Sequence, residues 1–201
     1  MSTLLKPLQV REELLRHNMR LFNPYEFGRL FHTPAYTTKY FLEEQTMQGL
    51  FVRLKKGVYA LKTDFPSEEE IANALYKPSY ISFEYALAYY GMLPEMPYKV
   101  TSATTKPTRL FTTASMSFGY YTIKKAAYTG YSLVTTDTKS FLIADPEKTL
   151  VDYIYFETLG KRPHNDRLIL KNMHKEKLMD YAQLYQRKSL INYLKDVYDI
   201  I

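Results

Sequence analysis

The chain has 201 residues, 46% of them hydrophobic, so a packed core is expected and global disorder is disfavoured. It contains no cysteine, which excludes disulfides and zinc sites built on thiolates. No apolar run reaches the roughly 20 residues of a membrane span, and the N-terminus lacks a signal-peptide core. We therefore expect a soluble, cytoplasmic protein with no membrane partner.

Most of the net positive charge lies in the first third of the chain. Residues 1–62 carry ten lysines and arginines against five acidic residues, a net charge of +5, whereas the whole chain has a formal net charge of +6. This asymmetry favours an anionic partner for the N-terminal segment, with nucleic acid as the first candidate. A solvated basic surface would give the same distribution.

Two helices are expected at the start of the chain. Leucines spaced among charged residues indicate a helix within residues 4–21, whose early part Pro7 interrupts. Asn23 followed by Pro24 provides a capping residue and a first-turn proline. A second, short helix is therefore expected to run through about Phe31.

A third helix and a basic hairpin follow directly. Thr33 can cap a helix over Pro34–Gln48, and Gly49 stands where a C-terminal cap glycine belongs. Two strand-like runs, residues 51–54 and 58–61, then flank a Lys-Lys-Gly turn. Two helices joined by a tight turn and followed by a hairpin tipped with cations form a winged helix-turn-helix.

The start of the third helix is the part that a helix-turn-helix presents to base edges. Its outer side chains and the hairpin cations make up the predicted DNA-binding set: Thr33, Tyr36, Thr37, Lys39, Tyr40, Arg53, Lys55 and Lys56. Hydroxyl groups can bond a base or a phosphate, and the cations can pair with phosphate. Glu43 and Glu44 oppose DNA contact further along. Two alternatives stay open, namely that the tyrosines pack against the first helix and that the lysines guard an edge strand.

Helices are expected again after residue 62. Ser67 and Glu70 make a capping box ahead of a helix that runs through about Tyr76. Ser82 is a candidate cap for a further helix that ends near Gly91. Both predictions rest on local signals alone.

Short strands and C-terminal helices complete the predicted fold. Thr-, Val- and Tyr-rich runs indicate strands near residues 99–104, 110–113, 119–123, 133–135 and 140–143, and Asp145-Pro146 opens a helix. The expected fold class is α+β. An N-terminal winged helix-turn-helix over residues 1–62 precedes a mixed α/β domain over 63–201, which has a small, mainly antiparallel sheet and C-terminal helices.

Catalytic signals are weak, so no catalytic residue, metal site or cofactor is predicted. The four histidines share no metal-ligand spacing, and neither a nucleophile elbow nor a Walker lysine loop is present. Asp137 and Lys139 could form half of a metal-dependent nuclease site, since carboxylates hold Mg²⁺ and a lysine can steady a nucleophile. A turn between strands explains the same residues, which leaves the nuclease a minor alternative.

Three segments in order along the chain match a family pattern. They are GLFVRLKKGVYAL (Gly49–Leu61), IANALYKPSYISFEYALAYYGM (Ile71–Met92) and IADPEKTLVDYIY (Ile143–Tyr155). Together they resemble the AbiEi-type antitoxin family, the transcriptional regulators of type IV toxin–antitoxin systems. The residues matched by position are Arg53 and Gly57 in the wing, Pro78, Tyr80 and Ser82 in the second motif, and Pro146, Leu150 and Asp152 in the third.

The resemblance implies two roles and two partners. The N-terminal domain would bind inverted repeats in double-stranded operator DNA and repress its own promoter. The C-terminal domain would neutralise a cognate nucleotidyltransferase-like toxin, with the second and third motifs serving structure rather than catalysis. The chain departs from the family's arginine-rich recognition helix, because only Lys39 is basic near its start. The alternative is a stand-alone protein-interaction module whose winged helix does not bind DNA.

Overall fold

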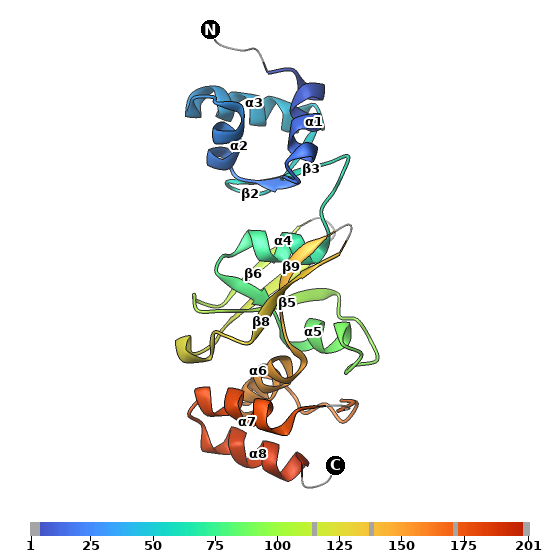
Figure 1. The fold of residues 1–201 in the computed structure, drawn as a ribbon, viewed down its shortest axis with the longest axis vertical. Coiled ribbons are helices and arrows are strands. Elements are labelled where there is room, and N and C mark those ends of the chain that lie inside the picture. Colours follow the sequence, from blue (N-terminus) through green and yellow to red (C-terminus); the bar gives the residue numbers. More distant parts are fainter. Residues whose placement is uncertain (1–4, 114–115, 137–138, 171–172, 199–201) are drawn as a thin grey trace. The chain divides into compact units, whose positions relative to one another are not determined.

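The computed structural model describes residues 5–113, 116–136, 139–170 and 173–198 (Figure 1). These residues form eight α-helices, a small antiparallel sheet and a larger mixed sheet, and they divide into two compact units, Met1–Leu75 and Tyr76–Ile201. The expectation of a mixed α and β protein is thereby confirmed. In the described part of the chain, no helix is both long enough and apolar enough to cross a membrane.

The first unit packs its helices around a three-stranded antiparallel sheet of order β1-β3-β2. Its elements are α1 (Pro7–Arg16), β1 (Leu21–Phe22), α2 (Pro24–Phe31), α3 (Ala35–Met47), β2 (Phe51–Lys55), β3 (Val58–Leu61) and α4 (Glu68–Leu75). Apolar side chains from the helices and the sheet form one core, which consists of Val10, Leu14, Phe22, Phe27, Leu42, Phe51, Tyr59 and Leu61. Phe22 lies at its centre, with its ring centroid 5.5 Å from that of Phe27 and 5.2 Å from that of Phe51.

Local capping signals explain where α2 begins and where α3 ends. Asn23 and Glu26 form a reciprocal capping box, since each side chain accepts a hydrogen bond from the other residue's backbone N–H, at 2.8 and 2.9 Å. At the end of α3, Gly49 takes a φ of 84°, and the N–H of Leu50 donates to the Gln45 carbonyl at 2.9 Å. This is a Schellman cap, and it confirms the predicted role of Gly49.

The predicted cap at the start of α3 is wrong. Pro34 occupies the N-cap position, and the helix start has no side-chain cap hydrogen bond from that position. The Thr33 hydroxyl lies 2.8 Å from the hydroxyl of Thr38, which is fully buried. A buried hydroxyl without a partner costs free energy, so Thr33 satisfies Thr38 rather than the helix backbone.

A local capping box begins α4, and two ion pairs join the segment that contains it to earlier residues of the first unit. Ser67 and Glu70 form the predicted capping box, with N–H to oxygen distances of 2.9 and 3.3 Å. Arg20 Nη2 lies 2.8 Å from Glu70 Oε1, and Arg11 Nη2 lies 2.8 Å from Asp64 Oδ2. These contacts join the segment after the hairpin to the helices that precede it.

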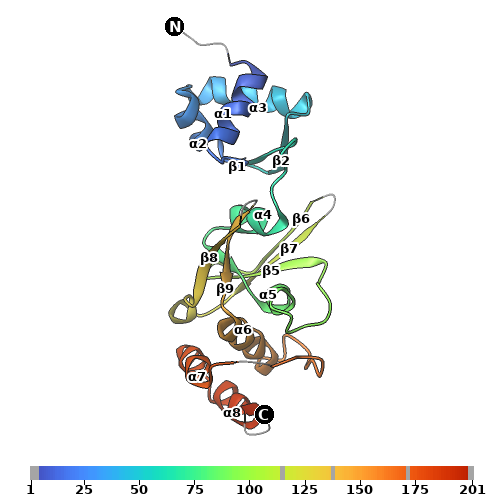
Figure 2. The same cartoon turned by 45° about the vertical axis from the view of Figure 1, so that its right-hand side comes forward.

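The second unit is built on a six-stranded mixed sheet of order β6-β7-β5-β4-β9-β8, covered by helices. Its elements are β4 (Ser79–Ile81), α5 (Phe83–Tyr89), β5 (Lys99–Thr104), β6 (Arg109–Thr112), β7 (Ser117–Thr122), a 3₁₀ turn η1 (Lys125–Ala127), β8 (Tyr131–Thr135), β9 (Ser140–Ala144), α6 (Pro146–Thr158), α7 (Lys175–Leu184) and α8 (Lys188–Tyr198). Figure 2 shows α5 alongside β5, and α6 beyond it. The core lies between these helices and the sheet, and it continues into α7 and α8.

The sheet is larger and less antiparallel than predicted. All five predicted strands are present, but the pairs β5–β7 and β4–β9 run parallel. Strand β4, which the sequence analysis missed, lies between β5 and β9 near the middle of the sheet. It has only three residues, too few to show a period of two, and its pairing depends on strands distant in sequence.

The start of α5 also differs from its prediction. Ser82 holds the N-cap position of α5, but its side chain makes no cap hydrogen bond. Thr101 of β5 supplies the cap instead: its Oγ1 accepts from the Tyr85 N–H at 3.1 Å and donates to the Ser82 carbonyl at 2.7 Å. The Ser82 hydroxyl is thus available for a different bond, to a carboxylate of α6.

Gly130 is required by the packing of α7. Its φ is 73°, and a Cβ added there would lie 2.7 Å from the ring of Tyr181. We expect Gly130→Ala to lower the free energy of unfolding by about 2–4 kcal/mol, from left-handed strain and overpacking together. Urea unfolding followed by far-UV circular dichroism measures this. Gly160→Ala is the matched control, since Gly160 has a φ of 65° and open space, so only the strain of about 1–2 kcal/mol applies.

A polar cluster at the end of α6 predicts a pH dependence. His164 Nδ1 lies 2.6 Å from Glu157 Oε1, and Nε2 lies 3.0 Å from Asp166 Oδ1. The hydrogen bond to Glu157 raises the pKa of His164 above its ordinary 6.5. A small stabilisation should therefore be present in full below pH 6.5 and be lost as pH rises through the folded-state pKa. NMR titration should give a pKa above 6.5 that falls in Glu157→Gln but not in Glu176→Gln.

Candidate functional site

The first two turns of α3 present an exposed face built from polar and aromatic side chains. Thr38 and Leu42 point into the core, which turns Tyr36, Lys39 and Tyr40 outward. Of these, Tyr36 is 71% exposed and Tyr40 56% exposed. The alternative in which both tyrosines pack against the first helix is therefore wrong, and both rings are available to a partner.

The two tyrosines form a pair on the helix surface. Their ring centroids lie 4.5 Å apart, with an angle of 59° between the ring planes. A side-chain hydrogen bond with Tyr40 raises the pKa of Tyr36. Tyr36 therefore stays neutral at physiological pH, and the two exposed rings offer apolar surface outward.

A groove of about 430 Å³ lies between α2 and the start of α3. Its lining comprises Pro24, Tyr25, Gly28, Arg29, Thr33, Ala35 and Thr38. The Arg29 guanidinium lies 5.9 Å from the centroid of the Tyr25 ring, which is 72% exposed. The predicted Thr33 thus lies in the wall of this groove, and Thr37 is half-buried beside the exposed face.

Tyr25 and Arg29 were missed by the sequence analysis. They lie four residues apart on α2, so they share one face of that helix, and both side chains are exposed. The sequence contained a signal for them. Phe27, between them, is apolar and buried, and residues on the opposite side of an amphipathic helix are expected to face solvent.

The β2–β3 hairpin has a two-residue tip, Lys56-Gly57, because Lys55 pairs with Val58. Gly57 takes a φ of 79°, as a tight hairpin turn requires. Arg53 and Lys56 are exposed, and among the described residues no ion pair joins either of them, or Lys39, to a carboxylate. Their charges are free to face an anion.

Lys55 differs from the other hairpin cations. Its side chain is half-buried, and its ammonium group donates a hydrogen bond to the Leu75 carbonyl at the end of α4. A cation at a helix C-terminus is favourable because the last carbonyls carry partial negative charge. Lys55 therefore fastens the hairpin to α4, and its ammonium is not directed to solvent as the sequence analysis expected.

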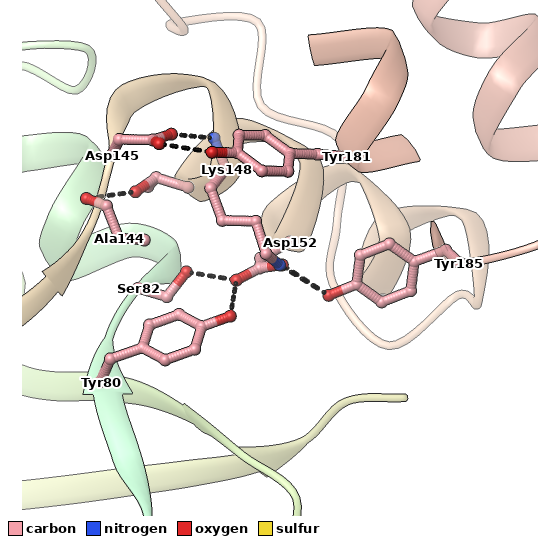
Figure 3. A network of polar contacts seen from close by, with 9 residues as sticks. Tyr80, Ser82, Ala144, Asp145, Lys148, Asp152, Tyr181 and Tyr185 are labelled. Atoms are coloured by element: carbon pink, nitrogen blue, oxygen red, sulfur yellow. Dashed lines mark hydrogen bonds and ion pairs between the residues drawn. The ribbon is translucent and has the colours of Figure 1, made fainter. Parts of the chain in front are cut away.

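A second constellation joins the residues of the two further family-like motifs. Tyr80 and Ser82, at β4 and just after it, donate to Asp152 Oδ2 of α6 at 3.1 and 2.8 Å. Tyr185 donates to Oδ1 at 2.5 Å, and the Lys148 ammonium forms an ion pair with the same oxygen. Figure 3 shows Tyr80 and Ser82 reaching Asp152 from one side and Tyr185 from another.

This constellation is closed to solvent. Tyr80, Ser82, Lys148, Asp152 and Tyr185 each have 0% exposure. Burial lowers the pKa of Lys148, against the opposing effect of Asp152, and burial raises the pKa values of Tyr80 and Tyr185. Four donors converge on one carboxylate, so its oxygens find their hydrogen-bond partners inside the unit. Since no substrate can reach these groups in this structure, the network joins β4, α6 and the end of α7 rather than acting on a ligand.

The nuclease alternative receives no support from the described residues. Asp137 lies outside them, and the Lys139 ammonium lies 5.1 Å from the centroid of the Phe141 ring. Over the ranges described, no group of three or more histidine or acidic side chains is placed to hold a metal ion.

No family model matches the chain, and no curated protein matches it either.

Proposed function

We propose that the first unit is a winged helix-turn-helix that binds duplex DNA, with α3 in the major groove and the β2–β3 hairpin on the phosphate backbone. Two observations carry the proposal. The start of α3 is exposed, and the hairpin cations Arg53 and Lys56 are exposed and have no carboxylate partner among the described residues. The order of elements, α1-β1-α2-α3-β2-β3, supports the same interpretation.

The exposed groups of α3 and of the hairpin suit a duplex. Lys39 can contact a phosphate beside the groove that α3 enters, and the hairpin tip can contact another. Arg29, beside the Tyr25 ring, extends the cationic surface along α2. Glu43, one turn further along α3, is exposed and repels phosphate, so the footprint is confined to the helix start.

Fluorescence anisotropy with labelled duplexes tests the proposal. The full chain should bind the DNA upstream of its own gene more tightly than an unrelated duplex of equal length. Both affinities should fall as salt rises, because phosphate contacts release counterions. Absence of binding to either duplex at low salt would contradict the proposal.

A charge-matched pair of variants separates the site from general basicity. Arg53→Ala with Lys56→Ala should weaken binding, whereas Lys124→Ala with Lys125→Ala, an equal loss of charge at exposed residues of the second unit, should not. Equal losses from both pairs would mean that net charge, rather than Arg53 and Lys56 in particular, produces the binding.

For the whole chain we propose an autorepressor and antitoxin whose second unit binds a nucleotidyltransferase-like toxin. The family resemblance suggests this role, and the edges of the six-stranded sheet support a protein contact. Leu110 on edge strand β6 and Leu133 on edge strand β8 are each 62% exposed. Exposed apolar residues on an unpaired strand edge are suited to a partner.

Co-expression with a nucleotidyltransferase encoded beside the gene tests the second role. The tagged full chain should retain that protein through purification and relieve its toxicity. Leu110→Glu or Leu133→Glu should reduce retention, with Thr112→Glu, also exposed on β6, as control. Retention without measurable DNA affinity would favour the stand-alone interaction module.

A further inference from the structure

The exposed face of α3 carries one side chain that can read a base with paired hydrogen bonds, Lys39, which we assign to a phosphate. Arginine and lysine read guanine in this way, and asparagine and glutamine read adenine, but no arginine, asparagine or glutamine occurs in residues 35–44. Gln45 is buried, and its amide donates to the Gln48 side chain at 2.9 Å. In a major groove, α3 must therefore recognise base pairs chiefly by contacts other than paired hydrogen bonds.

What α3 offers instead is apolar surface. Ala35, Tyr36 and Tyr40 are exposed on its first two turns, and together they form the apolar stripe of α3. The ring centroids of the two tyrosines lie 4.5 Å apart, so the rings support one another. A rigid aromatic pair can bury a small apolar group with little loss of side-chain entropy.

We propose that the apolar stripe of α3 reads the C5-methyl groups of thymines, with Tyr36 as the main specificity-determining residue. This deepens the proposed function and rests on it, since it requires α3 to lie in a major groove. The thymine methyl is the apolar group that standard base pairs present in that groove. Two cations lie near the stripe: Lys39 is on the same two turns of α3, and Arg29 lines the groove that Ala35 also lines. This positive charge complements the DNA phosphates, which favours DNA over an apolar protein partner.

Replacing thymine by deoxyuridine in the DNA tests the inference directly, because it removes the methyl and keeps the base pair. A high-affinity duplex is first selected from a random library with the full chain, and its thymines are then replaced one at a time. At one or two adjacent positions in each bound site, affinity should fall about fourfold per methyl lost, the value of burying one such carbon. Replacements elsewhere should have no effect.

Variants of Tyr36 assign the effect to the stripe. Tyr36→Ala should bring the thymine-to-deoxyuridine affinity ratio close to one at the sensitive position, whereas Tyr36→Phe, which keeps the ring, should preserve it. Tyr98→Ala is the matched control, since Tyr98 is a fully exposed tyrosine of the second unit. Because Tyr36 is on the surface, its replacement should leave the circular dichroism spectrum and melting temperature unchanged.

The outcomes separate this inference from the function on which it rests. Tight binding to a selected duplex that is insensitive to every deoxyuridine replacement overturns thymine reading and leaves DNA binding intact. A sensitive position whose ratio survives Tyr36→Ala overturns the role of Tyr36. Failure to select or bind any duplex at low salt overturns both proposals at once.

Discussion

Asp152→Ala should lower the free energy of unfolding by about 3–5 kcal/mol, the largest effect we expect from a single substitution. The variant removes the only carboxylate paired with the Lys148 ammonium among the described residues, and that ammonium is fully buried. It also removes the acceptor for three hydroxyl groups, those of Tyr80, Ser82 and Tyr185. Each buried donor left without a partner adds to the cost.

Urea unfolding followed by circular dichroism measures the loss, and hydrogen exchange of peptides from β4 and α6 locates it. Asp180→Ala, which removes an exposed carboxylate from α7, should stay within about 0.5 kcal/mol of the parent. Lys148→Met combined with Asp152→Leu should recover only the part of the loss that comes from the unpaired charge, because the hydroxyl groups of Tyr80, Ser82 and Tyr185 still lack this acceptor. A loss below about 1 kcal/mol in Asp152→Ala would mean that the Lys148 ammonium is not retained as a buried charge.

Removing Lys39, Arg53 and Lys56 together should weaken DNA binding by roughly ten- to a hundredfold at moderate salt. The reduction should be nearly equal on specific and unrelated duplexes, because the three cations are assigned to phosphates. The slope of log affinity against log salt should become less negative by about 2.7, which corresponds to three phosphate contacts at about 0.9 each.

Anisotropy titrations from low to moderate salt give this slope. The matched control replaces three exposed lysines of the second unit, Lys124, Lys125 and Lys188, and should leave the slope near that of the parent. Lys55→Ala should change the slope less than Lys56→Ala does, since the Lys55 ammonium is bonded to the Leu75 carbonyl. A selective loss at one base pair would instead make one of the three residues a base reader.

Local signals account for the parts of the fold that the sequence predicted well. The capping boxes at Asn23 and Ser67, the Asp145 cap and the positive φ of Gly57 each depend on residues within three or four positions. The hairpin and five strands of the larger sheet were found from short alternating or β-branched runs. Such features are visible in sequence because both partners lie in the same window.

Side chains whose partner lies far along the chain were predicted less well. Ser82 bonds Asp152, 70 residues away, while Thr101 takes over the cap of α5. Lys55 bonds a carbonyl 20 residues away. In each case the type of element was predicted correctly. The hydrogen-bond partner of the polar side chain was not, because it depends on which distant residues the fold places nearby.

The amino-acid sequence alone determined the helices, the hairpin and the concentration of positive charge in residues 1–62, because propensity, capping and charge are properties of short segments. Only the tertiary structure decided that Lys148 and Asp152, an ordinary i, i+4 pair, are fully buried, and that Tyr36 and Tyr40 are exposed. Burial depends on which distant elements cover a helix face, and no local pattern contains that information. The same physical reason explains why two adjacent lysines differ. Lys56 is exposed at the hairpin tip, whereas Lys55 donates a hydrogen bond to the Leu75 carbonyl at the end of α4.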